Sequence, residues 1–590
     1  MKFNEISNHI VSPFVFEFPL FLCCSLMMGV KGVLSRIIQQ SLHGTDIGAT
    51  PILIHISHLL IWFTFLSCFI YICYRFRKKW FRWSIFALFF VLFIIQDFLV
   101  QNFNSMISPS YLTLLAETNK NEATEFISQF VISRTSLSTL KRSFTVLLLF
   151  IVLELIWRNR IRVISFHKLY SIASPIIIIF LLWGGFLFVS TYAKILKDKE
   201  EITENLVPSD PFSRSFYSVI VAHGYGNRIK EAIGINRELP NSISCIEDSL
   251  NIVLVIGESY SKWHASLYGY YLDTTPFQTQ EQEKGRLFVF RDAVTTSNGT
   301  SMAMKNILCC NNLADNESWY ERPYLPTIIK KSGYDVAFWD NQRDFAQNST
   351  FTYTLNGFLY SPDIVSLSYS KLNQSSFEYD EDLILDYIKN YHGNNPLQFT
   401  IFHLMGQHFV PKNRYPNNTE NNVFSADDII QDAEYLTLEK KQMIAEYDNA
   451  TRYNDTVFES IVHLFENDNS IIIYLSDHGD EIYDFRDQIY REQGPLSIGK
   501  LKYQYEIPFM IWTSEKYNEN HPDIIHQIED ATEKRFSSDN LYHLILHLAG
   551  ISSPFYKEEY DIIHTDYSYP KRIVDEIFDF DEIMNQQNED

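Results

Sequence analysis

The chain has 590 residues, of which 46% are hydrophobic. This length exceeds what a single hydrophobic core accommodates, so the sequence predicts at least two domains. Charge is distributed unevenly: residues 1–195 hold 17 Lys and Arg against 8 Asp and Glu, whereas the remainder holds 32 against 63. Because nucleic-acid binding needs clustered basic residues, the carboxylate excess of the second part excludes that class of partner.

The first part contains five apolar stretches, each close to the roughly 20 helical residues that cross a bilayer. They are 12–34, 51–73, 80–101, 142–157 with its flanks, and 169–192. Basic clusters at 75–82 and 158–168 separate stretches two and three and stretches four and five, and basic loops stay in the cytoplasm. The sequence therefore predicts an internal N-terminus and an external C-terminal domain, which in a Gram-negative cell would be periplasmic.

We expect three parts: a five-helix transmembrane domain at 1–192, a bridging segment at the membrane surface at 193–248, and the external domain at 249–590. Three acidic residues fall inside or at the ends of the predicted spans: Glu17, Asp97 and Glu154. An acidic residue inside a membrane favours a functional role, and a position at the membrane interface is the alternative.

Three β-rich runs of the external domain end in polar residues, at 251–259, 399–408 and 470–481. Helical patterns separate the runs, and this alternation is typical of an α/β domain with a mostly parallel sheet. Ligands bind beyond the carboxyl ends of such strands, so we expect the polar residues to meet at one edge of the sheet. They are Glu258, His403, His408, Asp477, His478 and Asp480.

Carboxylates and imidazoles are the ligands of catalytic zinc, which binds about four donors and leaves one position for a reacting group. Asp477 and His478 form a tight pair, and Glu258 adds a third donor. The fourth should be a nucleophile in SNGTSMAMKNILCC (297–310), where Thr300 or Ser301 is expected at a helix N-cap. A metal ion can deprotonate such a hydroxyl, and the N–H groups of a helix end can hold a phosphoryl oxygen.

At these residues the chain resembles the phosphoethanolamine transferases of the alkaline phosphatase superfamily, which include lipid A, lipooligosaccharide and colistin-resistance enzymes. VIGES with HASLYGYYLDTTPF (255–277) is similar to the family's opening motif, and SDHGDE (476–481) resembles its SDHGE zinc motif. HLMGQH with RYP (403–416) resembles its histidine segment, and LAETNKNEATEF (115–126) looks like its ETN-x-x-EA loop. The resemblance implies five membrane helices followed by an α/β, alkaline-phosphatase-like (sulfatase-like) catalytic domain with a mostly parallel central sheet.

The resemblance also implies a Zn²⁺-dependent transfer in two steps. A threonine attacks phosphatidylethanolamine, releases diacylglycerol, and passes phosphoethanolamine to lipopolysaccharide core or lipid A. Glu258, Asp477 and His478 would bind the zinc, with Thr300 as fourth ligand and nucleophile. The protein would be a multi-pass protein of the bacterial inner membrane with its catalytic domain in the periplasm.

Four further residues receive roles by the same resemblance. His408 would bind substrate phosphate or a second metal ion, and His403 would support the site from outside the ligand set. Glu117 and Asn119 would meet the lipid headgroup at the membrane face. Trp339–Gln342 resembles a segment that borders the active site, with packing in the sheet as the alternative.

The chain also departs from the lipid A branch. Met302 stands where that branch has a second threonine, which favours Thr300 as the nucleophile with Ser301 as the alternative. The segment 490–497 has no histidine where that branch carries one, and Arg491 or Glu492 would take over contacts with the acceptor. Few cysteines and the run DEIYDFRDQ (480–488) look closer to the branch that modifies lipopolysaccharide core sugars.

Two other functions compete with this one. A phosphoglycerol transferase of the lipoteichoic-acid-synthase type shares the spans, the metal and the threonine. A non-catalytic membrane relative is the other, and the complete set of Glu258, Thr300, Asp477 and His478 argues against it. Sulfatase activity is disfavoured because the sequence has no Cys or Ser followed by the Pro and Arg residues that formylglycine maturation needs.

Overall fold

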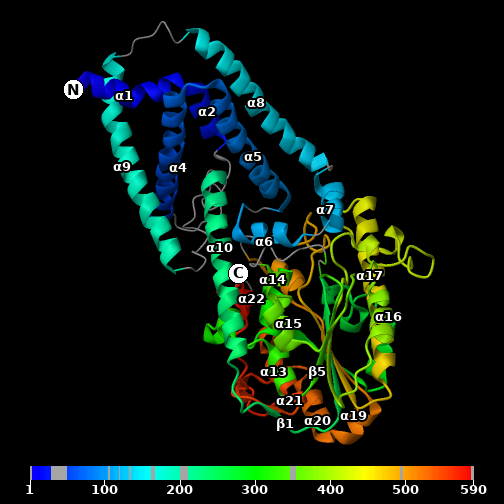
Figure 1. The fold of residues 1–590 in the computed structure, drawn as a ribbon. Coiled ribbons are helices and arrows are strands. Elements are labelled where there is room, and N and C mark those ends of the chain that lie inside the picture. The colour runs from blue at the N-terminus through cyan, green and yellow to red at the C-terminus, as the bar shows by residue number, and fades with distance from the viewer. Residues whose placement is uncertain are drawn as a thin grey trace. The chain divides into compact units, whose positions relative to one another are not determined.

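The structure is a computed structural model that describes residues 3–27, 49–103, 106–118, 120–131, 134–160, 167–198, 210–343, 345, 354–491 and 496–586. Contacts divide the chain into one unit of residues 1–225 with 492–494, and a second of 226–491 with 495–590. The division falls within helix α10 (Pro211–Arg237), inside the predicted bridging segment. Figure 1 follows the chain through both units. The boundaries expected at 192 and 248 remain predictions.

The first unit is helical. Its elements are α1 (Phe3–Phe16), α2 (Phe18–Leu26), α4 (Ala49–Phe76), α5 (Lys79–Phe103), α6 (Pro109–Glu117), α7 (Lys120–Phe126), the π-helix Ile127–Val131, α8 (Arg134–Arg160) and α9 (His167–Asp198). Three segments are long and apolar enough to cross a membrane: Ile56–Phe76, Lys79–Phe103 and Tyr170–Ala193. They correspond to the second, third and fifth predicted spans.

The first predicted span, 12–34, differs from the structure. Two helices, α1 and α2, meet at an angle of 63°, and residues 28–34 lie outside the described part. Pro13 lies inside α1 and Pro19 in the first turn of α2, and each proline lacks the N–H that a continuous helix needs. The bent pair counts as one span at most.

The fourth predicted span, 142–157, is only partly supported. Helix α8 has 27 residues, but its apolar portion, Ser143–Trp157, falls below the length that the other spans reach. Polar and basic residues flank that portion on both sides. The described residues therefore contain three helices of spanning length and composition, or four with the bent pair, in place of the five expected.

Two of the three acidic residues near the spans are paired with one arginine. Arg82 Nη1 lies 3.0 Å from Glu17 Oε1, and Arg82 Nε lies 3.7 Å from Glu154 Oε1. All three side chains are buried, and they join the N-cap of α2 to α5 and α8 within the helical unit. Because a buried charge is costly without a partner, this pairing accounts for both carboxylates. Asp97 lies in α5, and a functional role for these acids remains a prediction.

The second unit is built on a sheet of seven described strands in the order β3-β9-β8-β2-β7-β5-β6. They are β2 (Leu250–Gly257), β3 (Leu287–Phe290), β5 (Asp335–Asp340), β6 (Lys371–Leu372), β7 (Leu397–His403), β8 (Ser470–Ser476) and β9 (Phe509–Thr513). Only the pairs of β9 with β8 and β3 are antiparallel among these. The prediction of a mostly parallel sheet is confirmed, and the three β-rich runs are its adjacent strands β2, β7 and β8.

Short strands and helices complete this unit. The short strands pair as β1 (Ser244–Cys245) with β11 (Ile551–Ser552), β4 (Asp292–Val294) with β10 (Arg535–Ser537), and β12 (Ile573–Val574) with β13 (Phe578–Asp579). The helices are α11 (Pro276–Glu283), α12 (Thr300–Leu308), α13 (Leu325–Lys331), α14 (Leu355–Leu359), α15 (Pro362–Ser368), α16 (Asp380–Asn390), α17 (Leu438–Phe465), α18 (Ile498–Lys500), α19 (Glu515–Asn520), α20 (Pro522–Ala531), α21 (Leu541–Leu548) and α22 (Phe580–Gln586).

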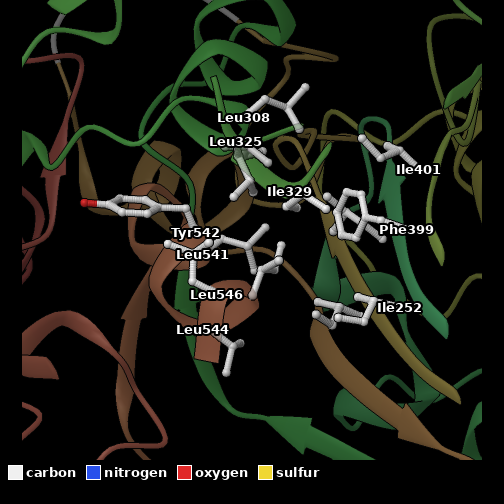
Figure 2. Close-up of a cluster of buried hydrophobic side chains, with 14 of the residues drawn as sticks. Ile252, Leu308, Leu325, Ile329, Phe399, Ile401, Leu541, Tyr542, Leu544 and Leu546 are labelled. Atoms are coloured by element: carbon white, nitrogen blue, oxygen red, sulfur yellow. The ribbon is translucent and has the colours of Figure 1, made fainter. Parts of the chain in front are cut away.

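Side chains alternate between the two faces of the sheet along each strand, and helices cover both faces. Ile252 and Leu254 of β2 join a core with residues of α12, α13 and α21, which Figure 2 shows in part. Val253 and Val255 join a second core with residues of α16 and α17. Burial of one such side chain contributes about 1.5 to 3 kcal/mol, so the two cores hold the strand ends in fixed register.

His264 ties the segment after β2 to this framework. Its Nδ1 lies 2.7 Å from Asp448 Oδ1 and its Nε2 lies 3.0 Å from Asp484 Oδ1, and the ring is buried. Burial lowers the pKa of His264, but the Asp484 and Asp448 carboxylates raise it more, to about 10. A folded-state pKa above the ordinary 6.5 stabilises the fold fully below pH 6.5, and the stabilisation disappears as pH rises through about 10.

We expect His264→Gln to lower the free energy of unfolding by about 3 kcal/mol at pH 6, because it removes the cation that pairs with the buried Asp448 and the half-buried Asp484. The difference from wild type should shrink between pH 6.5 and 10. Denaturant unfolding of the detergent-solubilised chain, followed by tryptophan fluorescence, measures it. His526→Gln is the control, since His526 pairs with Glu529 on the surface. A difference that stays constant over this pH range would contradict the assignment.

Candidate active site and metal centre

The carboxyl ends of three neighbouring strands form the site. Strand β2 pairs in parallel with β7 and β8, so that Ile256 lies opposite His403 and Gly257 lies opposite Ser476. Glu258 follows β2 directly, and Asp477 and His478 follow β8. These residues, separated by more than two hundred positions, therefore meet at one edge of the sheet.

Three buried side chains converge there. The ligand atoms of Glu258, Asp477 and His478 lie within 4.8 Å of one another. His478 Nε2 is 3.2 Å from Glu258 Oε1 and 3.0 Å from Asp477 Oδ2. Thr300 Oγ1 lies 3.1 Å from Glu258 Oε2 and 3.2 Å from His478 Nε2. The structure thus brings together the four residues predicted to hold the metal.

Thr300 is the first residue of α12. Gly299 occupies the N-cap, with φ −120° and ψ 126°, and its carbonyl accepts from the N–H groups of Met302 and Ala303. The expectation that Thr300 or Ser301 is the N-cap is therefore wrong. With Gly299 at the cap, the Thr300 hydroxyl lies against Glu258 and His478 instead of bonding the helix backbone. Ser301, the alternative nucleophile, is half-buried one position further along.

The chemistry of these donors fits a metal ion such as Zn²⁺. His478 Nδ1 lies 2.9 Å from the Gly479 carbonyl, so Nδ1 donates and Nε2 faces the carboxylates, as in a metal-ligating histidine. Asp477 Oδ2 is buried and receives no hydrogen bond from the described residues. Two buried carboxylates beside one imidazole need a cation to compensate them.

The pKa values follow from burial and from these charges. Burial raises the pKa of Glu258, but the charge and hydrogen bond of His478 and the charge of Arg491 hold it well below its usual range. Burial and Glu258 raise the pKa of Asp477. Burial and Arg491 lower the pKa of His478, while Asp477 and Glu258 raise it, to about 9 overall. The Asp477 and Glu258 carboxylates therefore favour a positive charge at His478 Nε2, which a proton or a metal ion can supply.

Gln342 links His403 to this centre. Its Nε2 donates to Glu258 Oε2 at 3.0 Å and to the Leu404 carbonyl at 2.8 Å, and lies 3.0 Å from His403 Nε2. His403 Nδ1 in turn lies 2.9 Å from Asp340 Oδ1. His403 thus reaches the centre through Gln342, and its supporting role remains a prediction. Gln342 itself was identified only as the end of the segment Trp339–Gln342. Trp339 is a core residue.

The other predicted residues are placed differently. The His408 Nδ1 is buried and has no hydrogen-bond partner among the described residues, and burial lowers the pKa of the ring to about 3, so it is neutral at physiological pH. Glu117 ends α6 in the helical unit, and Asn119 lies outside the described residues. Contact of Glu117 and Asn119 with a lipid headgroup remains a prediction.

Gly406 lets the loop after β7 pass directly over Glu258. Its φ is +50°, and a Cβ at this position would lie 2.6 Å from the Glu258 carbonyl oxygen and 2.9 Å from its nitrogen. The next residue, Gln407, donates its N–H to the Glu258 carbonyl at 3.0 Å. Only glycine fits here, and the contact fixes the backbone that carries Glu258.

The chain belongs to the Sulfatase family, whose model matches residues 250–551. It is similar to phosphoethanolamine transferase EptC of Escherichia coli strain K12, with 28% identity over 480 residues that cover 79% of each chain. The predicted resemblance to phosphoethanolamine transferases is thereby confirmed.

Two solved structures are similar to it. The crystal structure of the C-terminal periplasmic domain of EptC from Escherichia coli, in complex with Zn, has 26% identity and a TM-score of 0.51, covering 59% of this chain and 98% of that one. The integral membrane lipooligosaccharide phosphoethanolamine transferase A from Neisseria meningitidis has 18% identity and a TM-score of 0.59, covering 93% and 98%. The second likeness shows that both units share its fold.

Gln342→Leu should weaken zinc binding by about 10- to 100-fold, because the Nε2 donor that orients Glu258 is lost while side-chain size is preserved. Competition with a fluorescent chelator measures the affinity of the full-length protein. Gln374→Leu is the control, since Gln374 is exposed and donates only to the Leu372 carbonyl at 3.2 Å. Equal zinc affinity in the two variants would show that Gln342 does not position Glu258.

Proposed function

We propose that this protein transfers phosphoethanolamine from phosphatidylethanolamine to a lipopolysaccharide acceptor, in a zinc-dependent reaction with Thr300 as the nucleophile. One observation carries the proposal: Thr300 Oγ1 contacts both Glu258 and His478, which together with Asp477 form a buried group of possible metal ligands. The similarity to a named phosphoethanolamine transferase over 79% of the chain supports the reaction class.

Glu258, Asp477 and His478 would hold Zn²⁺, which when bound supplies a Lewis acid for the phosphoryl group and lowers the pKa of a hydroxyl beside it. The hydroxyl of Thr300 donates to Glu258 Oε2, which orients the oxygen and provides a path for its proton. Thr300 also stands at the positive end of α12, where the helix dipole favours an anionic phosphoryl group.

The reaction then has two displacements at phosphorus. In the first, a bond forms between Thr300 Oγ1 and phosphorus, the bond to the glycerol oxygen breaks, and diacylglycerol leaves with a proton. In the second, an acceptor oxygen attacks phosphorus, the bond to Thr300 breaks, and the threonine regains its proton. Gln342 and His403 keep Glu258 in place through both steps.

We further propose a lipopolysaccharide core acceptor and a location of the sulfatase-family domain in the periplasm. The absence of a histidine from 490–497 and the similarity to EptC support the core branch over the lipid A branch. Helices α4, α5 and α9 supply spans of sufficient length, and the basic cluster at 75–82 supports a cytoplasmic loop between the first two.

Thr300→Ala should abolish release of diacylglycerol from fluorescent phosphatidylethanolamine, because among the described residues Thr300 is the one whose hydroxyl contacts both Glu258 and His478. Thin-layer separation after incubation with detergent-purified, zinc-loaded protein measures the release. Ser301→Ala is the matched control and should retain activity. Loss in Ser301→Ala with retention in Thr300→Ala would reassign the nucleophile, and release from phosphatidylglycerol alone would reassign the donor.

A further inference from the structure

We propose that Arg491 binds the phosphoryl oxygens of the donor and of the phosphothreonine, so that its guanidinium neutralises the transferred group. This inference rests on the proposed function and assigns a binding group within the same site. Arg491 lies outside the metal-ligand set, and its guanidinium contacts the neighbours of Thr300.

The Arg491 guanidinium shares its neighbours with the nucleophile. Its Nη1 contacts His478 Nε2, the same ring atom that lies 3.2 Å from Thr300 Oγ1. Nη1 also donates to the Asn298 carbonyl at 3.0 Å, two residues before Thr300. A phosphorus atom bonded to Thr300 would therefore carry its free oxygens within reach of the Arg491 donors.

The contact with His478 cannot persist in the zinc-loaded protein. Nδ1 of His478 donates to the Gly479 carbonyl, so a metal ion would bind at Nε2. A metal-bound Nε2 has no lone pair left to accept a hydrogen bond from Arg491. Once Nε2 is a ligand, the Arg491 Nη1 donor needs another acceptor, and a phosphoryl oxygen beside Thr300 is one.

Asp480 provides an anchor for this exchange. Arg491 Nε lies 3.2 Å from Asp480 Oδ1, and Asp480 is buried. The Arg491 side chain keeps 22% of its surface exposed, so a substrate can reach it. The ion pair of Nε with Asp480 leaves Nη2, which lies 4.0 Å from Glu258 Oε1, and the second N–H of Nη1 as a planar fork for two phosphoryl oxygens.

His408 serves less well than Arg491 as the phosphate-binding group. His408 is neutral at physiological pH, and its Nδ1 has no partner that would hold it against a phosphoryl group. A lysine would supply a point charge without the paired donors.

The test compares Arg491→Gln, Arg491→Lys and Arg491→Gly in the zinc-loaded, full-length protein. Arg237→Gln is the matched control, because Arg237 forms an exposed ion pair with Asp363. Zinc content is measured by elemental analysis, and affinity for inorganic phosphate by calorimetry. Diacylglycerol release is measured with fluorescent phosphatidylethanolamine.

We expect Arg491→Gln to keep its zinc, to bind phosphate at least 10-fold more weakly, and to release diacylglycerol about 100-fold more slowly. Arg491→Lys should recover only part of the rate, since it restores charge without the fork. Guanidinium ions added to Arg491→Gly should restore turnover, which a purely structural arginine would not allow.

Loss of zinc from Arg491→Gln, or phosphate affinity equal to that of wild type, would overturn the inference. Wild-type protein that releases no diacylglycerol would contradict the proposed function instead. The phosphate comparison between wild type and Arg491→Gln would still decide the role of Arg491 in that case, because it requires no lipid substrate.

Discussion

The parallel pairing of β2 with both β7 and β8 is the constraint on which the site depends. It sets Glu258, His403 and Asp477 at the same edge, although Glu258 and Asp477 lie more than two hundred residues apart in the chain. A shift of one residue in the register of either strand pair would move each side chain of the shifted strand to the opposite face of the sheet. The ligands at the strand ends would then separate. The two hydrophobic cores on the faces of the sheet oppose such a shift, so apolar burial is what keeps the polar centre assembled.

The polar centre itself is electrostatically incomplete. Two buried carboxylates face one imidazole, and Asp477 Oδ2 receives no hydrogen bond from the described part of the chain. Around them, Gln342, His403 and Asp340 form a chain of contacts that fixes Glu258. Such a site holds its ligands in place before a cation binds, and the fold sustains the unfavourable burial of charge through the packing around it.

The sequence predicted best what depends on long-range regularity. Buried β-rich runs at 251–259, 399–408 and 470–481 identified the central strands, and the rule for parallel sheets placed their polar ends together. Helix caps and loop contacts lack such periodicity. For this reason the sequence did not predict Gly299 as the N-cap of α12, nor the contacts of Gln342 with Glu258 and of Arg491 with His478. The bend between α1 and α2 had a visible signal in Pro13 and Pro19, but average hydropathy conceals it.

The backbone of Glu258 and the loop after β7 touch at Gly406, with no room for a Cβ atom. A single methyl group there would displace the ligand-bearing segment while every ligand remained present in the sequence. A search for inactive relatives that inspects only metal ligands and the nucleophile would therefore miss chains that carry a larger residue at this position. Position 406 belongs among the positions that distinguish a working centre from one that has decayed.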